Sequence, residues 1–240
     1  MSISVSSFGA THVGYARDHN EDSYICAPEQ GLWVVADGVG GHEAGEVASA
    51  IVVDQVKQAH QESIPVTQAL LNAHQSVIDA PGRGRGKKGM GSTAVALVLN
   101  GSAYEIDWVG DSRAYLWNGT SLVQLTQDHT HVQRLVDQGV ITEEEAFTHP
   151  LANVLDQAIG VNEGQLAVDQ CTGELLTGER LLLCSDGLSG EVPHQEIESA
   201  FNENLDDHST TENLINAALA HGGTDNITAI VVSMRNDIDE

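Results

Sequence analysis

The amino-acid sequence predicts an α+β fold in which helices pack outside antiparallel sheets. Short apolar segments rich in Val, Ile or aromatic residues recur along the chain, and such segments are typical of strands. The strands come in groups joined by short turns, as between Val109 and Ala114, whereas segments with helical spacing come in pairs. A regular alternation of single strands with single helices would instead have indicated a parallel sheet.

Each element follows from the spacing of its apolar residues. The segments with the length and composition of strands are residues 23–26, 32–36, 93–99, 104–109, 114–117, 180–185 and 226–234. The segments with helical spacing are residues 46–60, 66–78, 131–138, 142–146, 194–201 and 210–221.

Length and composition predict one soluble domain. The chain has 240 residues, 41% of them hydrophobic, and shows no internal repeat and no linker, so we expect a single domain over residues 1–240. No segment approaches the roughly 20 apolar residues of a membrane-spanning helix, and the N-terminal residues lack the pattern of a targeting signal. A cytoplasmic monomer is therefore predicted. The three cysteines have no metal-type spacing and are expected to be core residues.

The charge balance restricts the partners. A formal charge of −25 would repel nucleic acid and anionic membranes. One segment departs from it: in residues 81–89, glycines alternate with Arg83, Arg85, Lys87 and Lys88. This loop is interpreted as an exposed, mobile connector, with attraction of acidic or phosphorylated partners as the alternative.

Two strongly apolar strands run directly into Asp-Gly, at Asp37-Gly38 and at Asp186-Gly187. A carboxylate there is held at the rim of the core, and the glycine allows a sharp turn and a close backbone approach. A single Asp-Gly after a strand is usually only a turn. Two such strand ends in one chain lower the odds that both are only turns.

Three further acids have similar settings. Asp22 and Asp225 each precede a predicted strand, and Asp111 lies in a tight turn. If these ends converge, the carboxylates repel one another and need compensating cations. An all-oxygen ligand set selects Mg²⁺ or Mn²⁺ over zinc, and two such ions could activate a water for attack on a phosphoryl group.

Basic and histidine residues supply the remaining candidates. Arg17, in a polar segment just before Asp22, could bind phosphate oxygens through its guanidinium fork, although a surface ion pair is an equal alternative. His42, in a glycine-rich turn that opens a helix, could donate a proton to a leaving alkoxide or simply be a capping or surface histidine. Arg113, His129 and His149 are expected to be structural.

Taken in order, these segments resemble the metal-dependent protein phosphatase family, also called the type 2C serine/threonine phosphatases, and its compact bacterial members in particular. The markers are Arg17 with Asn20, Glu21 and Asp22; Val35 to Gly41 around Asp37 and Gly38; Gly91, Ser92, Thr93 and Ala94; Val109 to Arg113 around Asp111; Cys184 to Leu188 around Asp186; and Gly223 to Thr228 around Asp225. The resemblance spans nearly the whole chain. It implies a four-layer α-β-β-α sandwich of two antiparallel sheets flanked by helix pairs, with a variable flap around residues 140–164, most of it in 149–164.

The resemblance also implies roles for the metal ligands. Asp37 would bridge two Mn²⁺ or Mg²⁺ ions, Gly38 would offer its carbonyl oxygen to one of them, and Asp186 and Asp225 would complete the other. Asp22 would hold the second ion directly or through water.

Three more positions match the family pattern. Glu21 would assist at the metal centre, Asp111 would support a third, weaker ion together with Asp186, and Arg17 matches the phosphate-binding arginine. The chain departs from the pattern at Val39, where some members carry a histidine that acts as general acid. Metal-bound water or His42 could supply that proton, and the sequence does not choose between them.

The expected function is hydrolysis of phosphoserine and phosphothreonine in proteins by attack of a metal-activated water, in opposition to a Ser/Thr kinase. A non-catalytic phosphoprotein-binding regulator of the same fold is the first alternative, although the chain retains every expected metal acid. A phosphatase for small phosphate esters is the second alternative. A calcium-binding module is disfavoured because the ligands are scattered from Asp22 to Asp225.

Overall fold

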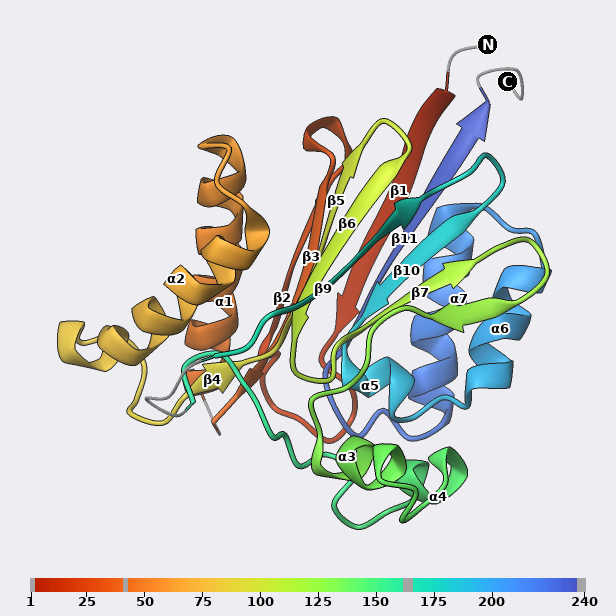
Figure 1. Ribbon diagram of the computed structural model, residues 1–240. Helices are drawn as coiled ribbons and strands as arrows, with labels where there is room; N and C mark the ends of the chain where they lie inside the picture. Colours follow the sequence, from red (N-terminus) through yellow and green to blue (C-terminus); the bar gives the residue numbers. More distant parts are fainter. Residues whose placement is uncertain (1–2, 41–42, 162–165, 237–240) are drawn as a thin grey trace.

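The computed structural model describes residues 3–40, 43–161 and 166–236. Two antiparallel sheets pack face to face, and a pair of helices covers the outer face of each sheet (Figure 1). The α-β-β-α order of layers predicted from the sequence is therefore confirmed.

Each sheet brings together strands from both halves of the chain. The first has the order β1 (Ile3–His12), β11 (Ile227–Asn236), β10 (Arg180–Cys184), β7 (Arg113–Trp117) and β8 (Leu122–Gln124). The second has the order β2 (Asp22–Ala27), β3 (Leu32–Val39), β5 (Ala94–Asn100), β6 (Ala103–Val109) and β9 (Asp169–Glu174), and the short β4 (Gly91–Ser92) pairs with the end of β3. All these pairings are antiparallel.

The helices fall into two outer pairs and a group at one end. The first pair, which is followed by the 3₁₀ turn η2 (Ala80–Arg83), is α1 (Glu43–Gln61) and α2 (Val66–Asp79), and the second is α6 (His194–Asn202) and α7 (Asp207–Ala220). The shorter α3 (His131–Asp137), α4 (Glu143–Phe147) and α5 (Asp186–Ser189) lie at the end of the sandwich where β3 and β10 finish (Figure 1). None of the described helices is long and apolar enough to cross a membrane.

Alternation along β3 explains how one strand serves two cores. Trp33 and Val35 pack between the sheets, whereas Val34 and Ala36 pack against α1 and α2. Successive side chains of a strand point to opposite faces, and both faces of β3 are covered. The strand therefore reads as one continuous apolar run that stops where the carboxylate of Asp37 reaches the rim.

Three edge strands escape the sequence prediction, β1, β8 and β9, of which β1 and β9 are the longer two. β1 carries a run of serines among its apolar residues and pairs only with β11, and β9 at the edge of the other sheet is largely exposed. Neither strand has the continuous apolar run that marks a strand covered on both faces. A short 3₁₀ turn, η1 (Pro28–Gln30), also joins β2 to β3.

Candidate active site

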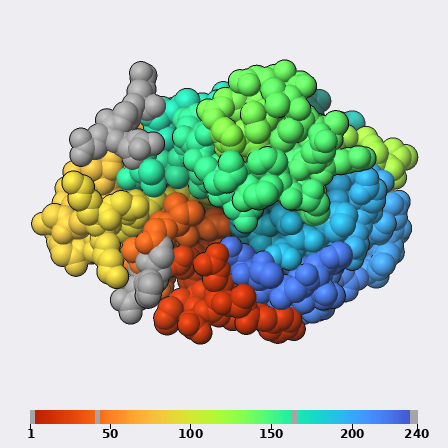
Figure 2. Space-filling view, turned by 90° about the horizontal axis from the view of Figure 1, so that it is seen from below, coloured from red at the N-terminus to blue at the C-terminus, as the bar shows by residue number. Residues whose placement is uncertain are grey.

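A cavity of about 270 Å³ opens at the end of the sandwich where the acid-bearing segments meet. Figure 2 shows the molecule from this end, where segments from the red, orange, green and blue parts of the chain adjoin one another. The residues that line the cavity are Arg17, Glu21, Asp37, Gly38, Val39, Gly40, Thr93, Asp111, Asn153, Leu155, Asp186 and Asp225.

Strand pairing accounts for this convergence. Asp22 and Asp37 are direct partners in the β2–β3 ladder. Asp186 begins α5 immediately after β10, and β10 pairs with β11 so that Cys184 lies opposite Ala229, close to Asp225. Antiparallel pairing therefore brings the end of one strand beside the beginning of the next.

Asp22, the buried ladder partner of Asp37, has one carboxylate oxygen held by two hydroxyl groups. Its Oδ2 accepts hydrogen bonds from Ser185 Oγ at 2.8 Å and from Thr228 Oγ1 at 2.6 Å. Burial raises the pKa of Asp22 to about 7, the two hydroxyl groups lower it, and the carboxylates of Asp186 and Asp225 raise it further. Its Oδ1 is buried and has no hydrogen-bond partner among the described residues.

The backbone of Asp37 is fixed by the segment around β4. Its N–H donates to Thr93 Oγ1 at 3.0 Å, and its carbonyl oxygen accepts from Ser92 Oγ at 3.0 Å and from the Thr93 N–H at 2.8 Å. Thr93 Oγ1 also lies 2.7 Å from Ser112 Oγ, in the turn that carries Asp111. One threonine thus connects the two turns that present Asp37 and Asp111.

Gly38 is required by a close approach of backbone. A Cβ atom built there would lie 2.2 Å from the carbonyl oxygen of Gly45 and 2.7 Å from that of Glu21. No side chain fits at such distances, because the start of α1 packs directly on the Asp-Gly turn. The glycine therefore allows helix, turn and Glu21 to meet at the cavity wall.

The carboxylates of the site carry pKa values shifted upward. Burial is the main cause for Asp37, Asp111 and Asp186, and nearby carboxylates add to it: chiefly Asp22 for Asp37, Asp186 for Asp111, and Asp225 for Asp186. Burial also raises the pKa of Glu21. Crowded carboxylates without a compensating cation favour their neutral forms. A cation bound among them would therefore stabilise their ionised forms.

Arg17 is the one cation among the described residues that line the cavity. Its Nη2 donates to Asp225 Oδ2 at 2.6 Å, and about half of its side chain is exposed. Arg17 therefore forms the ion pair that the sequence offered as one interpretation, and it does so at the cavity wall, whereas phosphate binding stays a prediction.

The donor set fits hard divalent cations. Glu21 Oε1, Asp22 Oδ1 and Asp186 Oδ1 are buried oxygen atoms with no hydrogen-bond partner in the described part of the chain, and such atoms are costly unless a ligand engages them. No three described His, Cys, Asp or Glu side chains close on one point tightly enough to hold an ion alone. An ion here would need a backbone carbonyl and waters as well, and Mg²⁺ in particular usually keeps several waters.

The predicted site residues thus come together, with one outside the description. Arg17, Glu21, Asp37, Gly38, Asp111, Asp186 and Asp225 line one cavity, and Asp22 is the buried ladder partner of Asp37. His42 lies outside the described residues. The roles of these residues in metal or phosphate binding stay predictions.

The residues expected to be structural have structural contacts. Arg113 forms a two-pronged ion pair with Asp128, in which its Nε and Nη2 donate to the carboxylate at 2.7 to 3.1 Å. Nδ1 of His129 accepts from the Gly110 N–H at 3.2 Å and so supports the Asp111 turn. Nδ1 of His149 accepts from the Leu151 N–H at 3.1 Å.

Several supporting residues were missed. Asn226 accepts from the Glu21 N–H at 2.7 Å and donates to the carbonyl oxygens of Val13 and His19 at 2.9 Å, which joins the Arg17 segment to β11. Its position directly after Asp225 was the available signal. Ser185 and Thr228 flank two predicted ligands, but nothing in the sequence indicates that both face Asp22.

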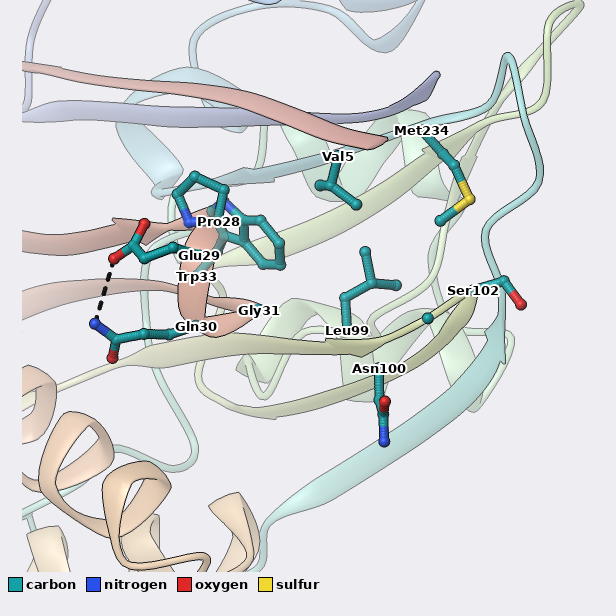
Figure 3. A pocket seen from close by; sticks show the side chains of 11 residues that line it. Val5, Pro28, Glu29, Gln30, Gly31, Trp33, Leu99, Asn100, Ser102 and Met234 are labelled. Carbon is teal, nitrogen blue, oxygen red and sulfur yellow. Dashed lines mark hydrogen bonds between the residues drawn. The ribbon is translucent and has the colours of Figure 1, made fainter. Parts of the chain in front are cut away.

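A larger cavity, of about 460 Å³, lies at the opposite end of the sandwich. Figure 3 shows it between Val5, Leu99 and Met234, beside the turn from Pro28 to Gly31. Of the described residues that line it, Glu29 alone is charged. Size therefore does not locate the chemistry here: the smaller cavity holds the clustered carboxylates.

Comparisons with known proteins agree with this geometry. The family model for protein phosphatase 2C matches residues 9–221. The chain is 38% identical to the serine/threonine phosphatase stp of Listeria welshimeri, over 92% of this chain and 93% of that protein.

Two solved structures share the fold throughout. The serine/threonine phosphatase Stp1 from Staphylococcus aureus matches with a TM-score of 0.87 and 32% identity, over 97% of this chain and 96% of that chain. The catalytic domain of the phosphatase PstP, in complex with two manganese ions, matches with a TM-score of 0.86 and 32% identity, over 98% and 100%. Sequence, fold and the position of the acidic cavity lead to one conclusion: the chain belongs to the protein phosphatase 2C family.

Proposed function

We propose that this protein is a metal-dependent protein serine/threonine phosphatase, which hydrolyses phosphoserine and phosphothreonine. The observation that carries the proposal is the cavity that gathers Asp37, Asp111, Asp186 and Asp225, with Arg17 at its wall and buried carboxylate oxygens that have no hydrogen-bond partner among the described residues. Its relatives are named serine/threonine phosphatases, and one related structure contains two manganese ions.

Two Mn²⁺ or Mg²⁺ ions would be held by the carboxylates of Asp37, Asp186 and Asp225, the Gly38 carbonyl oxygen and, directly or through water, Asp22. Glu21 would assist, and Asp111 with Asp186 would support a third, weaker ion. When bound, such ions lower the pKa of a water and polarise a phosphoryl oxygen.

The chain's own residues orient the substrate. Arg17 keeps one nitrogen on Asp225, lines the cavity, and has about half of its side chain exposed. A guanidinium fixed at one edge can offer its remaining N–H groups to phosphate oxygens with little loss of freedom. Its positive charge also favours a dianionic phosphate in a cavity that is otherwise acidic.

The proton for the leaving alkoxide has no assigned donor. Val39 lines the cavity at the position where a histidine would have served, and it has no proton to give. Donation by His42 or by water remains a prediction.

A second cavity-lining segment, Asn153 and Leu155, lies within residues 140–164, the predicted flap, and borders the same cavity.

Phosphate release from a phosphothreonine peptide and from 4-nitrophenyl phosphate tests the function. We expect release only with Mn²⁺ or Mg²⁺, and we expect Asp37→Asn to abolish it, whereas Asp54→Asn, an exposed carboxylate on α1, should leave it unchanged. Hydrolysis that persists in a chelator would refute the proposal. A non-catalytic regulator would instead bind phosphopeptides without releasing phosphate, and an enzyme for small esters would show the higher specificity constant on those.

The surroundings of the enzyme belong to the same proposal. We expect a cytoplasmic monomer whose substrates are proteins phosphorylated by a Ser/Thr kinase. The net charge of −25 supports the absence of nucleic acid and membrane partners.

A further inference from the structure

The basic loop, residues 81–89, concentrates positive charge in an acidic protein. It holds Arg83, Arg85, Lys87 and Lys88, whereas the whole chain has 10 Lys and Arg against 35 Asp and Glu. All four side chains are exposed. The loop is thus a positive patch on an acidic protein. Such a patch can attract anionic groups of a binding partner.

The other cations are mostly committed to internal partners. Arg113 is paired with Asp128, Arg180 and Arg235 with Asp207, and Arg134 with Asp156. In the basic loop, the described contacts include one long ion pair, between Arg83 and Asp79 at 3.6 Å. The loop therefore presents charge that the fold itself does not use.

The loop also has a defined shape. The N–H groups of Gly84 and Arg85 donate to the carbonyl oxygens of Pro81 and Ala80, and the Met90 N–H donates to that of Lys87 at 3.3 Å. Gly86 has φ of +66°, and a Cβ there would lie 2.2 Å from Met90 Sδ. Two successive turns thus shape this segment, and its mobility as a connector stays a prediction.

The residues that follow the loop, Met90 and Gly91, contact the wall of the acidic cavity. Val39 and Gly40 line the cavity. Gly91 pairs with Val39, and a Cβ on Gly40 would lie 2.9 Å from the Cα of Met90. Figure 2 shows the yellow surface of this part of the chain bordering the orange surface of α1 at the cleft end. One backbone turn, from Lys87 to Met90, therefore separates Lys87 from the residue that contacts Gly40 at the cavity wall.

We propose that the basic loop is a subsite for anionic groups that flank the phosphorylated residue of a protein substrate. An extended peptide advances ~3.4 Å per residue, so groups about two to four positions from the phosphorylated residue would reach the loop. Acidic side chains and second phosphate groups share the chemistry that Arg and Lys bind. The proposal rests on the phosphatase function above and adds a substrate preference to it.

Three matched phosphothreonine peptides test the subsite. One carries neutral flanking residues, the second replaces flanking Gln and Asn by Glu and Asp, and the third carries a second phosphothreonine. An exposed charge contact is expected to change kcat/KM by about two-fold. Three or four such contacts acting together should therefore make wild-type protein prefer the two anionic peptides by about ten-fold at low salt. The preference should shrink as salt is raised, because exposed charges are screened.

Variants of the loop separate this subsite from general charge effects. A four-site variant, with Arg83, Arg85, Lys87 and Lys88 each changed to Gln, should lose the preference and turn more active on the neutral peptide than on the anionic ones, because the remaining surface repels them. Lys87→Gln should lose about half of the preference. Lys57→Gln is the matched control: Lys57 is exposed on α1, about 20 Å along the helix from its first residue.

The control reactions keep the two proposals distinct. All variants should hydrolyse 4-nitrophenyl phosphate at the wild-type rate, because that ester does not reach the loop; a chain that hydrolyses neither substrate refutes the phosphatase function instead. Equal activity of wild-type protein on all three peptides overturns the subsite, as does an unchanged preference in the four-site variant. Loop-dependent flotation with phosphatidylserine vesicles without peptide discrimination would assign the loop to a membrane instead.

Discussion

Each carboxylate of the active site depends on neighbours that fix how it is presented. Asp22 is the clearest example, because Ser185 and Thr228 both donate to its Oδ2 and leave its Oδ1 without a partner in the described structure. Groups that hydrogen-bond to a ligand orient it and tune its affinity for metal. The two hydroxyl groups therefore occupy Oδ2 and would leave Oδ1 as the oxygen for an ion.

Replacement of Thr228 by Val tests this arrangement. The side chain keeps its shape and loses the hydroxyl group, so the affinity for Mn²⁺ should fall about ten-fold or more, while kcat at saturating Mn²⁺ changes little. Calorimetric Mn²⁺ titration and metal-dependent kinetics measure the two effects. Thr172→Val, on the exposed edge strand β9, should bind Mn²⁺ normally. An equal loss of kcat at saturating metal would show that Thr228 does more than position Asp22.

The sequence revealed the acids of this site more readily than their supports. Asp37 and Asp186 stand at abrupt junctions between apolar strands and glycine, and such junctions are visible in one dimension. Ser185 and Thr228 are ordinary hydroxyl residues whose shared partner is more than 160 positions away for the former and more than 200 for the latter. Only strand pairing determines that they meet at Asp22.

At the scale of elements, the predicted flap contains one short described helix, α4, that local contacts stabilise. The helix α4 buries none of its residues and begins with a capping box, in which Thr142 Oγ1 accepts from the Glu145 N–H and Glu145 Oε2 accepts from the Thr142 N–H. Such reciprocal caps satisfy backbone donors that a helix start otherwise leaves free. Helix α4 should therefore open and close as a local unit.

Thr142→Ala removes one half of this cap. Loss of a cap costs about 1 kcal/mol, so amide hydrogen exchange in residues 143–147 should become about five-fold faster, with no change in the urea midpoint of the whole protein. Thr142→Ser should restore the slow exchange, because it retains the hydroxyl group. Exchange rates that are equal in all three proteins would show that tertiary packing, and not the cap, holds α4.

The same local logic explains which elements the sequence predicted. Strands such as β3 and β10, covered on both faces, and helices such as α2, with an apolar stripe, carry strong patterns. Strands β1 and β9 lie at sheet edges and carry weak ones. Their assignment needs the partner strand, β11 for the first and β6 for the second.

Across the whole molecule, the acidic cluster links stability to metal. Asp22, Asp37, Asp111 and Asp186 have pKa values raised above those of an unfolded chain, so the metal-free folded state binds more protons than the unfolded state. Stability therefore falls as pH rises from about 4, the ordinary aspartate pKa, to about 7, the pKa of Asp22. Metal ions replace those protons and reverse the loss.

Urea unfolding in a chelator should thus show a midpoint that declines between pH 5 and pH 7.5. Added Mn²⁺ should raise the midpoint, and it should do so more at pH 7.5 than at pH 5, because protons compete with the metal. Asp22→Asn should flatten the pH dependence in the chelator, since the variant has no proton to lose at that position. A urea midpoint that rises with pH in the metal-free wild-type protein would contradict the raised pKa values of these aspartates.

The pairing of β1 with β11 has a consequence for how the protein comes to be folded. Ile3 lies opposite Asn236, and the ladder continues to His12 opposite Ile227, so the first described strand has no partner until the last one exists. Asp225 and Asn226 stand at the entry to that same last strand. Contacts between such distant parts of a chain form slowly. An emerging chain therefore has no complete cavity until β11 has paired with β1, and activity should appear only after that pairing.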